Sequence, residues 1–115
     1  MRERSRDKER LLHILEAINR IENYTNGVDY DTFISNGMMY YAVMMNISII
    51  GEAANLLTFE FREEHPETPW KFVVGTRNYM VHEYFQVDDI VVWDVITNDL
   101  PILKQQVEKF LAEME

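Results

Sequence analysis

The chain has 115 residues, 47% of them hydrophobic and 27% charged, a length and balance typical of one soluble globular domain. Eleven basic against twenty acidic residues give a formal net charge of -9. This argues against nonspecific adhesion to nucleic acid, because that affinity comes mainly from neutralising phosphates. There is no cysteine, which excludes disulfides, a thiolate nucleophile and cysteine-ligated metals, and fits a cytoplasmic protein.

The first ten residues, MRERSRDKER, are a charged run that holds five of the eleven cations. The other 105 residues therefore carry six cations against seventeen acids, so any contact with nucleic acid has to be local. No apolar stretch of the kind that a secretory signal needs follows this run. We expect residues 1–10 to be a charged N-terminal extension of the first helix.

The next segment predicts an amphipathic helix. Its apolar residues recur at spacings of three and four: Leu11, Ile14, Leu15, Ile18 and Ile21. The helix is expected to end near the sequence NYTNG, where Asn26 and Gly27 are a stop signal. A short polar segment, VDYDTFISNG, follows and can form one or two helical turns before Gly37.

The stretch from Met38 to about Phe61 has the length of a helix and is apolar on nearly every side. Such a helix should lie at the centre of a bundle or against a second subunit, and in so small a chain a dimer interface is the more economical explanation. Gly51, Ala53 and Ala54 form a patch of small residues that would let another helix approach closely. We expect Pro66 to end the helix. Its longest unbroken apolar run, MMYYAVMM, is far shorter than the roughly 18 to 20 residues of a membrane span, so no membrane association is expected.

Cap signals mark the beginning of two further helices. Thr68 followed by Pro69 is typical of an N-cap with proline at the first helical position, and predicts a helix that runs toward His82. Asp88 and Asp89 resemble the cap and acidic first turn of a helix that continues to residue 97.

The sequence NDLP repeats this signal before the last helix, where Asn98 or Asp99 can be the cap. The expected buried stripe of this helix consists of Leu100, Leu103, Val107, Phe110 and Leu111. No alternating strand pattern competes anywhere in the chain. The sequence therefore predicts an all-α bundle of about four to six helices.

The histidines do not predict a metal site. His13, His65 and His82 are scattered, and HEYF lacks the second histidine of a zinc-binding helix motif. A structural role is favoured for His13, which lies beside an apolar stripe, and a capping role for His65, which precedes a proline. Glu52 interrupts the apolar central helix. It is either a buried acid with a function or a residue that faces solvent or a polar partner, and the sequence leaves both readings open.

The stretch RNYMVHEY, residues 77–84, concentrates polar and titratable side chains. On a helix, Asn78 and His82 are neighbours on one face, while Arg77 and Tyr84 are nearly in register. Arg77 and His82 lie about 140° apart on ideal geometry, yet a long arginine can fold toward the same cleft. An arginine that stays charged and a histidine that titrates near neutrality suit phosphate-ester chemistry. The spacing alone still favours a solvated helix end.

Four segments in their order resemble the HepT-like toxins of the HEPN superfamily: LLHILEAINRI, AVMMNISIIGEAAN, PWKFVVGTRNYMVHEY and DDIVVWDVITNDLPILK. The resemblance covers nearly the whole chain, from Leu11 to about Leu111. Its most specific part is an arginine, a polar residue, three further residues, a histidine, one residue and a tyrosine. These are Arg77, Asn78, His82 and Tyr84, without departure from the motif.

The resemblance implies one HEPN-type helical domain over residues 1–115, paired as a homodimer whose motifs face one another across a cleft. It also implies the toxin of a type VII toxin–antitoxin system, a metal-independent endoribonuclease that needs no cofactor and cleaves transfer RNA or another cellular RNA. Arg77, Asn78 and His82 would be catalytic. The implied partner is a minimal nucleotidyltransferase antitoxin of the MntA type, which neutralises the toxin by transferring AMP to the motif tyrosine, Tyr84.

On these residues the resemblance gives His82 the role of general base or acid, Arg77 that of holding the phosphate, and Asn78 that of orienting the imidazole or the phosphate. Tyr79 and Met80 are expected to pack. Two alternatives remain. One is a non-catalytic helical module that holds a nucleotidyltransferase or another protein, and the other is a module that binds nucleotide without cutting RNA.

Overall fold

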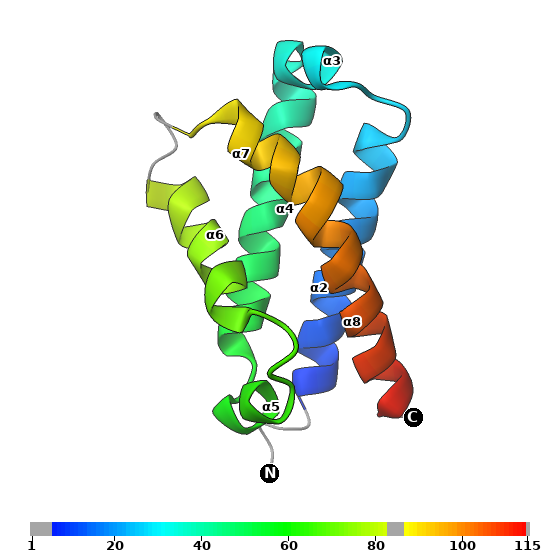
Figure 1. Cartoon of the computed structure of the whole chain (residues 1–115), viewed down its shortest axis with the longest axis vertical. Coiled ribbons are helices and arrows are strands. Elements are labelled where there is room, and N and C mark those ends of the chain that lie inside the picture. Colours follow the sequence, from blue (N-terminus) through cyan, green and yellow to red (C-terminus); the bar gives the residue numbers. More distant parts are fainter. Residues whose placement is uncertain (1–5, 83–86, 115) are drawn as a thin grey trace.

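The computed structural model describes residues 6–82 and 87–114, and within these ranges it consists of helices and short connections without a strand (Figure 1). The elements in chain order are α2 (Asp7–Thr25), α3 (Tyr30–Ser35), α4 (Gly37–Leu56), α5 (Phe59–Glu64), α6 (Trp70–His82), α7 (Asp89–Asp94), the π-helical segment η1 (Val95–Asp99) and α8 (Leu100–Glu113). The predicted all-α bundle is confirmed.

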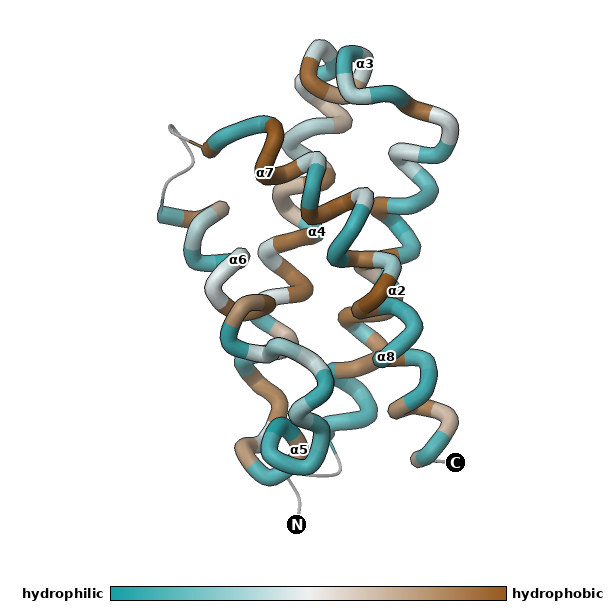
Figure 2. Tube along the Cα trace, in the orientation of Figure 1, coloured by the Kyte–Doolittle hydropathy of each residue, from teal (hydrophilic) through white to brown (hydrophobic). Residues whose placement is uncertain are grey.

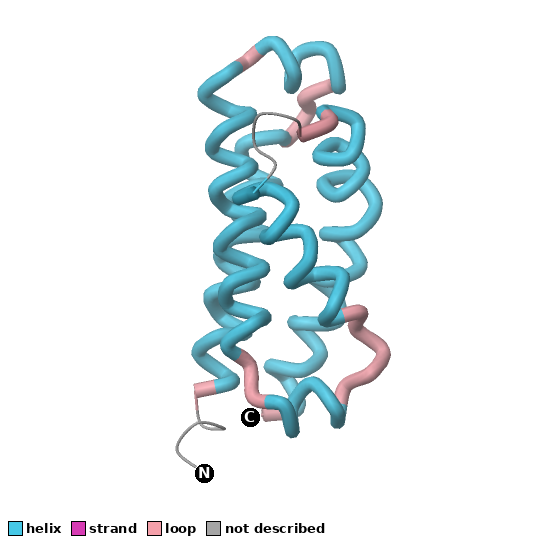
Figure 3. The backbone as a smooth tube through the Cα atoms, turned by 90° about the vertical axis from the view of Figure 1, so that its left-hand side faces the viewer, coloured by secondary structure: helices cyan, strands magenta, loops and turns pink. Residues whose placement is uncertain are grey.

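The central helix of the bundle is α4, which packs against both α2 and α6, while α8 packs along α2. The short helices α3 and α5 lie at opposite ends of the long axis (Figure 1), and the side view of Figure 3 shows the long helices running roughly along that axis. The molecule measures 45 × 28 × 21 Å. Because α4 meets α2 on one side and α6 on another, much of its apolar surface is buried within the chain.

Rows of apolar side chains on α2 and α8 supply the core around α4. In the predicted stripe of α2, the side chains that are fully buried are Leu11, Ile14, Ile18 and Ile21. On α8, which alternates between hydrophobic and hydrophilic residues in Figure 2, the buried side chains are Leu100, Leu103, Val107 and Phe110. Each such side chain contributes about 1.5–3 kcal/mol relative to an exposed one. Both predicted stripes are confirmed, with Leu15 and Leu111 half-buried at their edges.

The central helix ends earlier than predicted, at Leu56. Thr58 then begins a separate short helix, α5, because its side-chain oxygen accepts a hydrogen bond from the backbone N–H of Phe61 at 3.2 Å. The expectation of one helix that reaches about Phe61 and is ended by Pro66 is therefore wrong. A threonine cap interrupts the helix before the proline is reached.

The start of α6 is anchored to α8. The helix begins at Trp70, one residue later than predicted, so Pro69 directly precedes it and its carbonyl accepts from the backbone N–H of Val73 at 3.0 Å. The Thr68 side chain does not form the predicted cap. The Thr68 side chain is buried, and its hydroxyl donates to the amide oxygen of Gln106 at 2.8 Å. This hydrogen bond joins the beginning of α6 to α8 across 38 residues of sequence.

The cap of α7 agrees with the sequence. The Asp88 carboxylate accepts from the backbone N–H of Ile90 at 3.0 Å, and Asp89 lies in the first turn. Acidic side chains are favourable there because the free N–H groups give a helix N-terminus partial positive charge.

The helix does not stop where the sequence NDLP suggested a new cap. It continues from α7 through η1 into α8, and the backbone N–H of Leu100 donates to the carbonyl of Val95. Asp99 makes no side-chain cap hydrogen bond, so the prediction of a separate cap at Asn98 or Asp99 is wrong. Pro101 lacks an N–H, and the wider π turn directly before it gives its ring room within the helix.

Candidate active site

The predicted cluster lies on α6. This helix carries Arg77, Asn78 and His82, and His82 is its last residue. Because α6 is helical throughout this stretch, Asn78 and His82 are one turn apart on the same face, as predicted. Tyr84 lies outside the described residues.

Two side chains hold the guanidinium of Arg77. Its Nη1 donates to Oδ1 of Asn78 at 3.0 Å, and its Nε lies 3.4 Å from Oε2 of Glu52 on α4. The Arg77 side chain is 33% exposed and that of Glu52 52% exposed, so solvent screens the ion pair and its stabilisation stays below about 1 kcal/mol. The principal effect of these contacts is therefore to fix the direction of the guanidinium.

The backbone of α4 approaches Arg77 closely at Gly51. Gly51 is buried, and a Cβ built on it would collide with the Cβ of Arg77. A residue without a side chain is thus required where the two helices meet. The predicted small-residue patch is confirmed at this position, where the neighbour is α6.

Glu52 is the site residue whose role the sequence left undecided. Of the two readings, the structure supports an exposed carboxylate that faces a polar partner, and the partner is Arg77. The signal in the sequence was an acid inside an otherwise apolar helix, directly after a glycine. That signal could not name Arg77, because the contact depends on how α4 and α6 cross.

His82 stands free of the arginine pair. Its side chain is exposed and makes no hydrogen bond or ion pair with another residue that the structure describes. The imidazole is therefore accessible one turn beyond Asn78. The structure brings Arg77, Asn78 and Glu52 into contact and leaves His82 adjacent on the same helix.

The other two histidines differ from each other. His13 is exposed on α2. His65 is the C-cap of α5, with its Nδ1 at 2.8 Å from the carbonyl of Phe61 and its ring stacked on the Phe61 ring at 4.1 Å. The predicted capping role of His65 is confirmed.

Tyrosines hold the start of α7 against α4 and α6. The Tyr79 hydroxyl accepts a hydrogen bond from the backbone N–H of Asp88 at 2.9 Å. Burial, and next its hydrogen bond to Asp89, raise the pKa of Tyr40 well above its usual range. Met80 is buried, which confirms the expectation that it packs. These contacts lie near the His82 end of α6.

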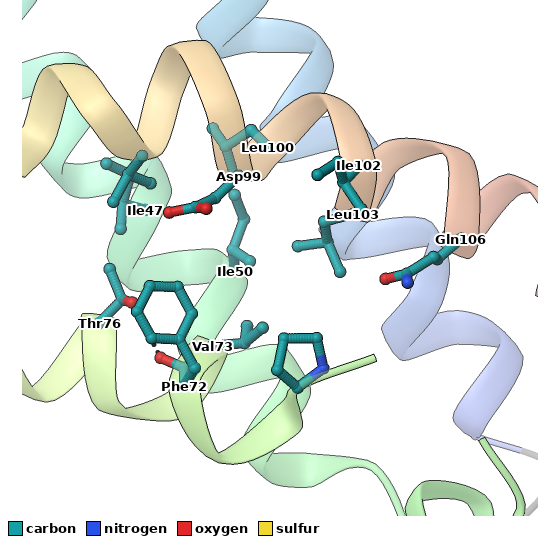
Figure 4. Close-up of a pocket in the computed structure, with 12 residues that line it drawn as sticks. Ile47, Ile50, Phe72, Val73, Thr76, Asp99, Leu100, Ile102, Leu103 and Gln106 are labelled. Carbon is teal, nitrogen blue, oxygen red and sulfur yellow. Dashed lines mark hydrogen bonds between the residues drawn. The ribbon is translucent and has the colours of Figure 1, made fainter. Parts of the chain in front are cut away.

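A separate pocket lies between α6, α4 and the η1–α8 helix (Figure 4). It is lined by Ile47, Ile50, Pro69, Phe72, Val73, Thr76, Val95, Asp99, Leu100, Ile102, Leu103 and Gln106. The hydroxyl of Thr76 donates to the carbonyl of Phe72 at 2.9 Å, the contact dashed in Figure 4. The predicted site residues do not line this pocket, and its largely apolar walls do not suit a phosphate.

Within residues 6–82 and 87–114, no group of three or more histidine, aspartate or glutamate side chains is arranged to hold a metal ion. In the same ranges, no helix combines the length and the apolar character needed to cross a lipid bilayer.

Comparison with known proteins identifies relatives over most of the chain. The model of a family described as "Ribonuclease HepT-like" matches residues 14–110. A protein of Methanocaldococcus jannaschii named "Putative RNase MJ1380" is 43% identical over 98 residues, which are 85% of this chain and 90% of the relative. A protein of Thermococcus cleftensis named "Probable ribonuclease HepT" is 36% identical over 102 residues, which are 89% of this chain and 93% of the relative. No solved structure matches the chain at a significant level.

Proposed function

Since the chain belongs to the HepT-like ribonucleases of the HEPN superfamily, we propose that it cleaves RNA internally and without a metal ion, using Arg77 and His82 as its working pair. The observation that carries this proposal is the held guanidinium of Arg77, with an accessible His82 on the same helix. Arginine binds phosphate through paired, charge-assisted hydrogen bonds, and histidine moves protons near neutral pH.

The reaction needs only groups that RNA and these residues supply. The 2′-oxygen of the substrate attacks the adjacent phosphorus while a base takes its proton, and the 5′-oxygen leaves and takes up a proton. His82 serves as base or acid in these transfers, a role worth typically about 10² to 10⁴ in rate. Arg77 stabilises the negative charge that develops on the phosphorus centre. Asn78, bonded to Arg77 and one turn before His82, orients the two groups.

A homodimer completes the proposal. Exposed apolar residues form a line on α4, named here the α4 outer stripe: Met38, Tyr41, Met45 and Leu56. At about 100° per residue these positions lie within an arc of about 60°, and Glu52 falls within the same arc. A second copy that covers the stripe would bring two Arg77–Glu52 pairs near each other. Two arginines and two histidines would then line one cleft, with the two Glu52 carboxylates beside the arginines.

The proposal extends to the biological role of the protein and to its regulation. We assign the chain as the toxin of a toxin–antitoxin pair that acts on transfer RNA or another cellular RNA. A minimal nucleotidyltransferase of the MntA type is its antitoxin and transfers AMP to Tyr84. The added group would obstruct RNA by bulk and by negative charge, because a phosphate would then lie near the site of the substrate phosphate.

Cleavage of RNA by the purified protein in the presence of a chelator tests the proposal. Wild-type protein should cleave. His82→Ala should lower the rate by about 10² to 10⁴ and Arg77→Ala by about 10² to 10³. His13→Ala, which alters an exposed histidine on α2, is the matched control and should cleave as wild type does. Loss of cleavage with EDTA while the protein stays folded would contradict the metal-free mechanism.

Mass spectrometry tests the proposed transfer of AMP to Tyr84. After coexpression with a nucleotidyltransferase of this type, intact mass should rise by one or more AMP groups, and peptide mapping should assign them to Tyr84. Tyr84→Phe should remain unmodified and active. A folded wild-type protein that binds the nucleotidyltransferase but cleaves no RNA would instead support a non-catalytic binding module.

A further inference from the structure

The side chain opposite Arg77 on α4 suggests a further role in the reaction. We propose that Glu52 is a positioning residue, which holds the guanidinium of Arg77 so that its outer edge faces the phosphate of the substrate. The inference rests on the proposed function, because it takes Arg77 as the residue that binds phosphate. Glu52 itself would touch neither the substrate nor the reacting atoms.

The donor inventory of Arg77 supports this role. A guanidinium has five N–H groups in a fixed plane. Its Nε atom lies 3.4 Å from Oε2 of Glu52 in the ion pair, and one Nη1 hydrogen is donated to Oδ1 of Asn78 at 3.0 Å. The other Nη1 hydrogen and the two on Nη2 have no hydrogen-bond acceptor among the residues that the structure describes. This arrangement leaves an edge that suits two parallel hydrogen bonds to phosphate oxygens.

The helix crossing fixes the other end of the same side chain. Gly51 brings the backbone of α4 against the Cβ of Arg77, so the root of the side chain has little room to move. Glu52, the next residue on α4, then contacts the side chain near its tip. A long, flexible arginine loses rotamer freedom when it aligns with the charge that develops on phosphorus in the transition state, and two contacts made beforehand reduce that loss. Gly51 and Glu52 thus restrict the Arg77 side chain at its two ends.

A carboxylate beside a phosphate site also has an opposing effect, which makes the proposal testable. A glutamate that only adds negative charge would repel RNA, and its neutralisation would lower KM and leave kcat unchanged or higher. A positioning glutamate acts in the transition state, so its neutralisation lowers kcat while KM stays constant or falls. The two roles therefore predict different changes in kcat.

The first test compares Glu52→Gln with Glu22→Gln at constant ionic strength. Glu22 is a matched control because its side chain is 46% exposed and is paired with Lys104 at 2.7 Å, on α2 and α8. We expect Glu52→Gln to lower kcat about tenfold without raising KM, and Glu22→Gln to behave as wild type. Glu52→Asp, which keeps the charge on a shorter side chain, should recover part of the lost kcat. Urea unfolding of Glu52→Gln should match wild type, as expected for a half-exposed pair.

The second test does not require catalysis. In ¹H–¹⁵N spectra the Nε–H signal of Arg77, assigned through Arg77→Lys, should shift in Glu52→Gln and stay in place in Glu22→Gln. Either an unchanged kcat or an unchanged Arg77 Nε–H signal in Glu52→Gln overturns the positioning role. If wild-type protein cleaves no RNA, the proposed function fails, and the Nε–H signal alone then decides whether Glu52 positions Arg77.

Discussion

Single polar residues join segments that are distant in the sequence. Asp7, at the start of α2, is buried, and its carboxylate accepts hydrogen bonds from the backbone N–H and the hydroxyl of Thr58, at 2.9 and 2.7 Å. Thr58 in turn caps α5. One carboxylate thus connects the beginning of the first described helix to the segment that follows α4, 51 residues away.

Removal of this carboxylate should destabilise the fold. Asp7→Ala would leave the partly buried backbone N–H of Thr58 without its acceptor, so the free energy of unfolding should fall by about 1–3 kcal/mol. Glu9→Ala, which alters an exposed acid in the same first turn, should stay within about 0.5 kcal/mol of wild type. Urea denaturation measures both, and equal midpoints for the two variants would refute the role given to Asp7.

At the scale of residues, the sequence predicts contacts within one element better than contacts between elements. The cap at Asp88 and the turn at Gly27, which has a positive φ of 72°, could be read directly, because local hydrogen bonds and backbone freedom determine them. The Arg77–Glu52 pair could not be predicted from the sequence. Its residues are 25 positions apart, and their meeting depends on the helix crossing at Gly51.

Helix packing at the α4–α6 crossing depends on the absence of one side chain. Gly51→Ala should force the two helices apart, and we expect a loss of about 1–3 kcal/mol in the free energy of unfolding together with reduced RNA cleavage. Gly75, on α6, offers the matched control because a Cβ there would meet nothing within 4 Å. Gly75→Ala should gain about 0.5–1 kcal/mol, since alanine favours the helix. Thermal and urea unfolding would show whether the two substitutions have opposite signs.

Asp99, in η1, should make the stability of the fold depend on pH. Burial, and then the nearby charge of Asp94, raise the pKa of Asp99 above its usual 3.8. Protonation of Asp99 therefore stabilises the fold, and this stabilisation is full below pH 3.8 and is lost as the pH rises through the folded-state pKa. Asp99→Asn cannot ionise, so its Tm should exceed that of wild type at pH 7, and the difference should shrink toward pH 3.8.

Asp29 is the control with the opposite sign. The hydrogen bond from the backbone N–H of Thr32 lowers the pKa of Asp29, so its contribution is present above the unfolded-state pKa and is lost as the pH falls. Asp29→Asn should therefore give no gain in Tm at pH 7. Melting curves between pH 3 and pH 8 distinguish the two, and a gain for both variants would show that general charge reduction is the cause.

At the scale of elements, the sequence predicted the positions of the helices and misjudged two junctions. The periodic stripes of α2 and α8 are strong because each helix has one buried face. The α4–α5 junction has no such signal, since apolar residues continue through it and a single threonine decides the break. At η1 the capping residues Asn98 and Asp99 are present, but the packed helix continues through them by widening one turn.

The proposed dimer is a property of the whole molecule. Met45→Glu would place a charge in the α4 outer stripe, where Met45 is 63% exposed in the single chain, and should shift the protein from dimer to monomer. Ile102→Glu is the control, because Ile102 is similarly exposed, at 58%, on α8. Each chain carries a charge of -9, so added salt should strengthen the wild-type dimer by screening repulsion. Sedimentation equilibrium at two salt concentrations measures each effect.

The two tryptophans lie near opposite ends of the long axis. Trp70 has ring neighbours in Phe61 and Phe110, at 6.0 and 6.2 Å, near α5, whereas Trp93 meets Phe33 and Tyr30, at 5.3 and 5.9 Å, near α3. The fluorescence of each indole thus reports on one end of the bundle, which is called a pole here. In Trp70→Phe and Trp93→Phe, the remaining emission would follow the melting of one pole alone. Coincident transitions would show that the 45 Å bundle unfolds as one cooperative unit, and separate ones that its poles melt independently.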